Sequence, residues 1–98
     1  MQKNKIETLE HFINRTGMHI VPITELSIIS WIHGFEEGSG TNIFTKSLKE
    51  HLEVTFEIYG GCLGWPRHIR LYSEKSKTDW NNAFFEIAKI IVDKLKDN

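Results

Sequence analysis

The sequence predicts an all-α fold: a small single domain, residues 1–98, built as a bundle of four to five antiparallel helices. Three observations support this prediction. Apolar residues recur every three or four positions in the longer segments, which places them on one face of a helix. The segments between them are short, as in antiparallel helix pairs. Of the 98 residues, 40% are hydrophobic and 26% are charged, a composition that suits one ordinary core.

The first helix is expected to start at Asn4, because the side chains of Asn4 and Glu7 can each satisfy a free backbone donor at the other position. Gly17 supplies the left-handed residue that often ends a helix. Residues 18–22 should then form a short extended connector, since the residue before Pro22 avoids helical geometry. The buried face of this helix is predicted to hold Ile6, Leu9, Phe12 and Ile13.

The second helix is predicted to begin after Thr24, which can cap it while Ile23 packs on Ile28. Its apolar sector is wide, which indicates contact with more than one neighbouring helix. We therefore expect this helix to lie at the centre of the bundle. The sector consists of Leu26, Ile28, Ile29, Trp31, Ile32 and Phe35.

The segment 41–59 is predicted to form a third helix, since four of its apolar residues share one face. These residues are Phe44, Leu48, Leu52 and Phe56. An alternative stays open, because apolar and polar residues alternate over 52–58, as in a half-buried strand. In that case the fold would be α+β, with a short hairpin at about residues 52–72.

Two more elements complete the chain. Pro66 suits the first turn of a short helix over residues 66–72, although a strand there is also possible. Thr78 or Asp79 then opens the last helix, whose final turns carry three lysines that oppose the helix dipole. Its apolar stripe is predicted to hold Trp80, Phe84, Ile87, Ala88, Ile91 and Leu95.

Several classes of protein are disfavoured by composition. The longest apolar run, around residues 26–32, is far shorter than the ~20 residues that a membrane span requires. The amino terminus carries lysines and glutamates without an apolar stretch, so we expect no secretory signal and no contact with a membrane. Cys62 is the only cysteine, which excludes an internal disulfide and fits a reducing compartment. The expected location is the cytoplasm.

No catalytic, metal or cofactor site is predicted. The five histidines show no HExxH spacing, and the glycines of 34–40 surround two glutamates that would repel a phosphate. Cys62 and His68 could act as nucleophile and base, but a small buried thiol is the plainer interpretation. The net charge of −1 also argues against direct binding of nucleic acid, despite four bases among the aromatic residues of 65–77.

Acidic residues give the clearest indication of function. The segment between Met18 and Trp65 contains six acidic residues and only two basic ones. Several of these carboxylates could imitate phosphates toward a basic partner, with Trp65 as an apolar anchor. In the plainer interpretation the glutamates are only solvated and Trp65 belongs to the core. The predicted partner-binding residues are Glu36, Glu37, Glu50, Glu53, Glu57 and Trp65.

Aromatic residues and glycines from Trp31 onward follow a recognisable spacing. The runs are Trp31-Ile32-His33-Gly34-Phe35-Glu36-Glu37-Gly38, Gly64-Trp65-Pro66, Ile69, Tyr72-Ser73 and Trp80 with Phe84-Phe85-Glu86-Ile87. In this spacing the chain resembles small bacterial immunity proteins encoded beside polymorphic or contact-dependent-inhibition toxins. The resemblance implies a cytoplasmic protein that binds the catalytic domain of a toxin, frequently a nuclease, and blocks its active site. It implies no catalytic residues.

The expected function is therefore that of an immunity protein, a monomer that binds one toxin molecule without a cofactor. An acidic surface suits a nuclease toxin, because the surface that binds a nucleic acid must be basic. Two alternatives stay open. One is a regulatory or adaptor module that binds another protein, and the other is a small enzyme that uses Cys62 and His68.

Overall fold

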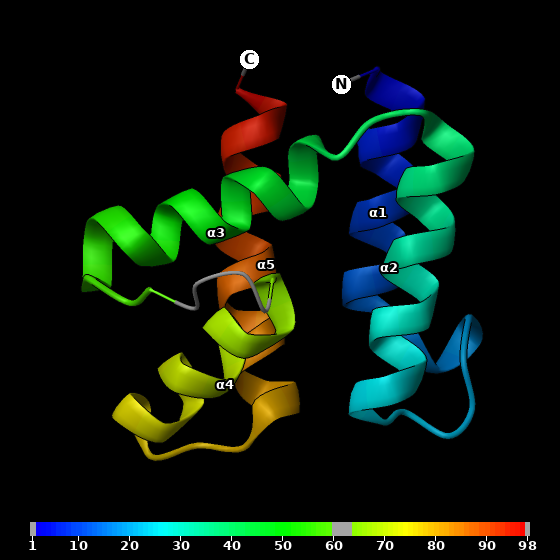
Figure 1. Cartoon of the computed structure of the whole chain (residues 1–98). Helices are drawn as coiled ribbons and strands as arrows, with labels where there is room; N and C mark the ends of the chain where they lie inside the picture. The colour runs from blue at the N-terminus through cyan, green and yellow to red at the C-terminus, as the bar shows by residue number, and fades with distance from the viewer. Residues whose placement is uncertain (1, 60–63, 98) are drawn as a thin grey trace.

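The computed structural model describes residues 2–59 and 64–97, and across them the chain is helical with no strand (Figure 1). The elements are α1 (Lys3–Asn14), the 3-10 helix η1 (Thr16–Met18), α2 (Glu25–Ser39), α3 (Ile43–Phe56), α4 (Trp65–Ser76) and α5 (Trp80–Lys96). The predicted all-α fold is confirmed. The α+β alternative is wrong, because residues 52–56 complete α3 and residues 65–72 lie in α4. No helix in these ranges has the length and apolar character that crossing a membrane would demand.

The last helix, α5, is the centre of the fold. It packs against α1, α3 and α4. Figure 1 shows α1 running antiparallel to α2 and α5, while α3 crosses in front of α5. The antiparallel arrangement expected for the bundle thus holds for α1 with α2 and α5, whereas α3 lies across α5 (Figure 1).

The prediction that α2 is central is wrong. Among its residues only Ile28 and Ile32 are buried, and 73% of Leu26 is exposed. The reason is geometric: apolar residues surround much of α2, but a helix at the edge of a bundle presents one side to the core. A wide apolar sector therefore shows how much surface a helix could bury, not how much it does bury.

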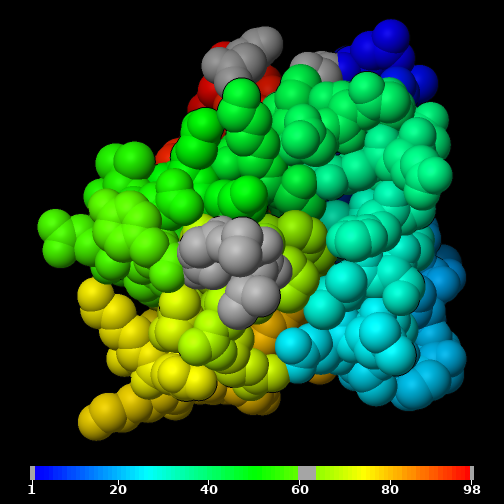
Figure 2. Space-filling model, viewed as in Figure 1, coloured from blue at the N-terminus to red at the C-terminus, as the bar shows by residue number. Residues whose placement is uncertain are grey.

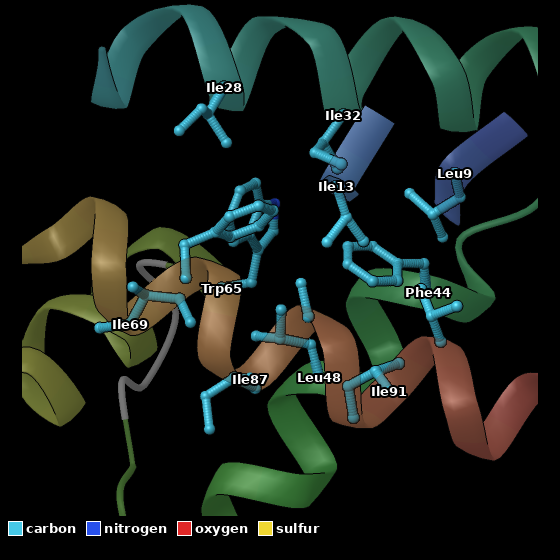
Figure 3. Close-up of a cluster of buried hydrophobic side chains, with 14 of the residues drawn as sticks. Leu9, Ile13, Ile28, Ile32, Phe44, Leu48, Trp65, Ile69, Ile87 and Ile91 are labelled. Carbon is cyan, nitrogen blue, oxygen red and sulfur yellow. The ribbon is translucent and has the colours of Figure 1, made fainter. Parts of the chain in front are cut away.

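One buried cluster joins side chains from all five α-helices (Figure 3). Ile28 and Ile32 of α2 point toward Trp65 and Phe44, which come from α4 and α3. Each large apolar side chain that is fully buried contributes roughly 1.5–3 kcal/mol. The stripe predicted for the last helix is confirmed: Trp80, Phe84, Ile87, Ala88, Ile91 and Leu95 are all buried.

Helix ends confirm the prediction in three places. The Thr24 side chain accepts from Ser27 N at the start of α2, and the Asp79 side chain accepts from Asn82 N at the start of α5. Pro66 lies in the first turn of α4, although this helix extends to Ser76 and is longer than expected. Local sequence signals locate these ends because both partners in each cap are three residues apart.

The ends of α1 differ from the prediction. The helix begins at Lys3, so Asn4 lies inside it and Gln2 precedes it without a side-chain cap. It ends at Asn14 and not at Gly17, which belongs to η1. The backbone leaves helical geometry at Arg15, with φ of −135°, two residues before the glycine. Thr16 Oγ1 then donates to Phe12 O at 2.8 Å.

Candidate protein-binding surface

The six residues predicted to bind a partner do not form one surface. Glu36 of α2 is engaged within the protein. Its Oε2 accepts from Thr45 N at 3.0 Å, and its Oε1 accepts from Thr45 Oγ1 at 2.8 Å. The first turn of any helix has free N–H groups, and Asn42, the residue that precedes α3, supplies no side-chain cap. Glu36 therefore caps α3 from the neighbouring helix.

Glu53 is also engaged, in a pair with His68. Glu53 Oε2 lies 2.9 Å from His68 Nε2, and His68 Nδ1 lies 3.0 Å from Gly64 O. The His68 side chain is fully buried, whereas 35% of the Glu53 side chain is exposed. A carbonyl oxygen can only accept, so Nδ1 donates to Gly64 and Nε2 faces the carboxylate. The pair ties the start of α4 to α3.

Of the two residues in the suggested enzyme site, the structure describes only His68. His68 is buried, and both of its ring nitrogens face oxygen atoms of Glu53 and Gly64. Cys62 lies outside the described residues.

Trp65 belongs to the core. Its exposed fraction is 5%, and its ring lies 6.0 Å from that of Trp80 and 5.7 Å from that of Phe84, centre to centre. A surface anchor must be accessible to a partner, and a buried indole is not. The aromatic character of this position is explained by packing between α4 and α5.

The other three predicted residues, Glu37, Glu50 and Glu57, are exposed. Glu50 and Glu57 share the outer side of α3 with Val54, because these positions are four and three residues apart. The buried residues of α3 lie on the opposite side; they are Phe44, Thr45, Leu48 and Leu52. Glu37 lies near the end of α2 and is not part of this row.

Two exposed apolar side chains extend the row. The exposed fraction is 81% for Val54 and 68% for Tyr59. We call this surface the α3 ridge; it consists of the exposed residues Glu50, Val54, Glu57 and Tyr59. The carboxyl-terminal end of α3 projects at the left edge of Figure 2. The sequence pattern did not single out Val54, because Leu52, Val54 and Phe56 alternate with polar residues as in a strand. In the helix, Val54 lies four residues after Glu50 and therefore on the outer side.

A turn at the end of α3 presents the last part of the ridge. Glu57 adopts left-handed backbone geometry, with φ of 56°, and Ile58 N donates to Leu52 O at 3.2 Å. This pattern commonly closes a helix and places the residue after the turn against it. Ile58 is accordingly buried, while Glu57 and Tyr59 on either side of it are exposed.

A groove between α3 and α5 borders the ridge. Lys94 Nζ donates to His51 Nδ1 at 2.8 Å within it. Burial, and then the ammonium group of Lys94, lower the pKa of His51 below its ordinary value of 6.5, so its imidazole is neutral at pH 7. The groove is lined by Ser47, Glu50, His51, Val54, Thr55, Lys94 and Leu95.

The arrangement of side chains suits binding by shape and charge. Within residues 2–59 and 64–97, no three histidine, cysteine, aspartate or glutamate side chains gather closely enough to enclose a metal ion.

In comparisons with known proteins, no family model, no curated protein and no solved structure matches the chain.

Proposed function

We propose that this protein is a cytoplasmic immunity protein that binds the catalytic domain of a cognate toxin, one to one, and covers its active site. The toxin is a nuclease whose substrate-binding surface is basic. The observation that supports this proposal is the α3 ridge, which combines exposed carboxylates with the exposed side chains of Val54 and Tyr59. A basic active site that attracts phosphates also attracts such carboxylates, and charge complementarity gives speed and specificity to the encounter.

The ridge also offers an anchor for a partner. Tyrosine is enriched among the residues that dominate binding energy, since its ring covers a large area and its hydroxyl tolerates water. Tyr59 is exposed two residues after Glu57, which is also exposed. Tyr59 takes the role that the sequence suggested for Trp65.

Coexpression with the polypeptide encoded directly upstream tests the proposal. The upstream product alone should stop growth of a bacterial host, and this protein should restore growth and elute with the product as a complex of one copy each. Purified complex should lack nuclease activity. The proposal fails if the upstream product does not bind, or if the bound product keeps its nuclease activity.

A charge reversal tests the surface. Glu50→Lys with Glu57→Lys should abolish protection at low expression and weaken binding at low salt. The matched control is Glu74→Lys with Asp93→Lys, which makes the same change in net charge at two other exposed carboxylates. If the ridge variant binds as tightly as the natural protein at low salt, the acidic surface is not the interface.

A regulatory or adaptor module would bind its partner through the same ridge. The growth assay distinguishes it from an immunity protein, because the partner of an adaptor would not stop growth of the host. The enzyme alternative is tested by Cys62→Ala and His68→Gln. A folded variant that still protects the host shows that neither side chain is needed for protection.

A further inference from the structure

Two histidines meet on the α1 side of the molecule, away from the α3 ridge. His11 Nδ1 lies 2.7 Å from His19 Nε2, and the two ring centres are 4.9 Å apart. Both side chains are exposed, so a solute can reach the nitrogens. At this distance one facing nitrogen donates its N–H to the lone pair of the other, and a shift of the donor ring to its other tautomer leaves a lone pair on both facing nitrogens.

The two imidazoles are held in place by packing and by backbone bonds. His11 lies in the last turn of α1, and His19 follows η1, where its N–H donates to Thr16 O at 2.9 Å. The His19 ring stands edge-on to the rings of Phe12 and Trp31, each 5.6 Å away. Ligands fixed in this way lose little conformational freedom when an ion binds.

A carboxylate is available on the same side of the helix. Glu7 is one turn before His11, and the two side chains line an open pocket together with Asn4, Thr8 and His19. Glu7 does not lie within coordination distance of both histidines, because no group of three such ligands is present among the described residues. The proposal therefore requires a different rotamer of Glu7, one that turns its carboxylate toward the two histidines across the pocket they share.

We propose that His11 and His19, with Glu7 as the third ligand, bind one divalent transition-metal ion such as Zn²⁺ or Ni²⁺. Imidazole nitrogens and one carboxylate are ligands that these ions prefer, with metal–nitrogen distances of about 2.0–2.1 Å. At such distances the two nitrogens stand about 2.9 Å apart in octahedral geometry and about 3.3 Å apart in tetrahedral geometry. In the structure the two nitrogens face each other at 2.7 Å across a hydrogen bond. Binding therefore requires the two exposed rings to separate by a few tenths of an ångström and to turn until both lone pairs converge on the ion.

The bound ion would clamp the connector between α1 and α2 to α1. Each imidazole must offer a lone pair to the ion, so binding weakens as the pH falls and protons compete for the same nitrogens. Because the ion binds the folded chain, it raises the melting temperature in proportion to the logarithm of its concentration above the dissociation constant.

Titration calorimetry of tag-free, EDTA-treated protein with ZnCl₂ and NiCl₂ at neutral pH tests the proposal. We expect one ion per chain. His11→Ala and His19→Ala should each weaken binding by at least ~10-fold, because even changes outside the ligand shell cost ~10–100-fold. Glu7→Gln should weaken binding less. His33→Ala, which removes an exposed histidine on α2, should have no effect.

Trp31 provides a second readout. Its ring is 5.6 Å from His19, whereas Trp65 and Trp80 are buried between α4 and α5. Cu²⁺ bound at the pair should therefore quench the fluorescence of Trp31, and Trp31→Phe should remove most of the quenching. His19→Asn keeps a polar side chain and serves if His19→Ala does not fold.

Two results would overturn the proposal: no binding by Zn²⁺ or Ni²⁺, or unchanged affinity in both folded histidine variants. This site lies on α1 and its connector, so neither result bears on the proposed function of the α3 ridge.

Discussion

Glutamate side chains serve two different purposes on α2 and α3. Glu36 and Glu53 complete the fold, one as a cap for Thr45 and the other as the partner of His68. Glu50 and Glu57 are exposed on the α3 ridge. The sequence places all four among acidic clusters but does not reveal their partners, because Thr45 is nine residues from Glu36 and His68 is fifteen from Glu53. Local spacing identifies an acidic surface, and the fold decides which carboxylates remain on it.

This difference predicts opposite outcomes for two alanine substitutions on one helix. Glu53→Ala removes the carboxylate that lies 2.9 Å from the buried His68 Nε2 and should lower the free energy of unfolding by about 1–3 kcal/mol. Glu50→Ala removes an exposed carboxylate and should change it by less than about 0.5 kcal/mol. Urea unfolding followed by circular dichroism measures both. Equal effects in the two variants would show that the Glu53–His68 pair does not stabilise the fold.

His51 predicts a pH dependence of stability. Burial and Lys94 lower its pKa in the folded chain below 6.5, so the unfolded chain binds a proton more readily in the range just below that value. The contribution of His51 is therefore present above about pH 6.5 and is lost as the pH falls through this range. His51→Gln can still accept from Lys94 but does not titrate.

The measurement is the fall in the free energy of unfolding between about pH 7.5 and 5.5, in the natural chain and in His51→Gln. The fall should be smaller in the variant. The other four histidines are present in both proteins, so the difference isolates His51. An equal fall in both would contradict the assignment.

At the scale of the element, helices could be predicted where their signals are local. The capping residues Thr24 and Asp79 and the stripe of α5 follow from residues within a few positions of each other. The position of α2 did not follow, because periodicity describes one helix and not its neighbours. The cap that Glu36 gives to α3 was also invisible, since it comes from another helix.

The end of α3 carries a second prediction. Glu57 and Lys77 are the two non-glycine residues with positive φ among those described, at 56° and 57°. Glycine adopts this geometry without steric cost, so Glu57→Gly and Lys77→Gly should each raise the free energy of unfolding by about 0.5–1 kcal/mol. Only Glu57→Gly should weaken binding of the partner, because Lys77 ends α4 and is not on the ridge. If neither variant is more stable in thermal unfolding, the left-handed geometry costs nothing here.

At the scale of the whole molecule, the charge asymmetry of the sequence is partly cancelled by pairing. Bases of the carboxyl-terminal half bind acids from earlier segments: Arg70 pairs with Glu25, and Lys96 with Glu10. Lys75 donates to Phe56 O at the end of α3, where a cation opposes the helix dipole. The exposed glutamates Glu50 and Glu57 therefore indicate a basic partner more directly than the net charge of residues 18–65 does.

The kinetics of association with the proposed toxin domain should divide between the two kinds of residue on the ridge. Charges that steer an encounter act mainly on the association rate constant and lose effect as salt is added. Glu50→Lys with Glu57→Lys should lower this constant by ~10-fold or more at low salt and reduce its salt dependence. Tyr59→Ala should instead raise the dissociation rate constant by ~30-fold, the effect of losing an anchor worth about 2 kcal/mol.

Leu26→Ala, which truncates an apolar side chain that is 73% exposed on α2, is the control and should change neither constant. Surface plasmon resonance at two salt concentrations separates the constants, and a Leu26→Ala effect equal to that of Tyr59→Ala would place the interface on α2.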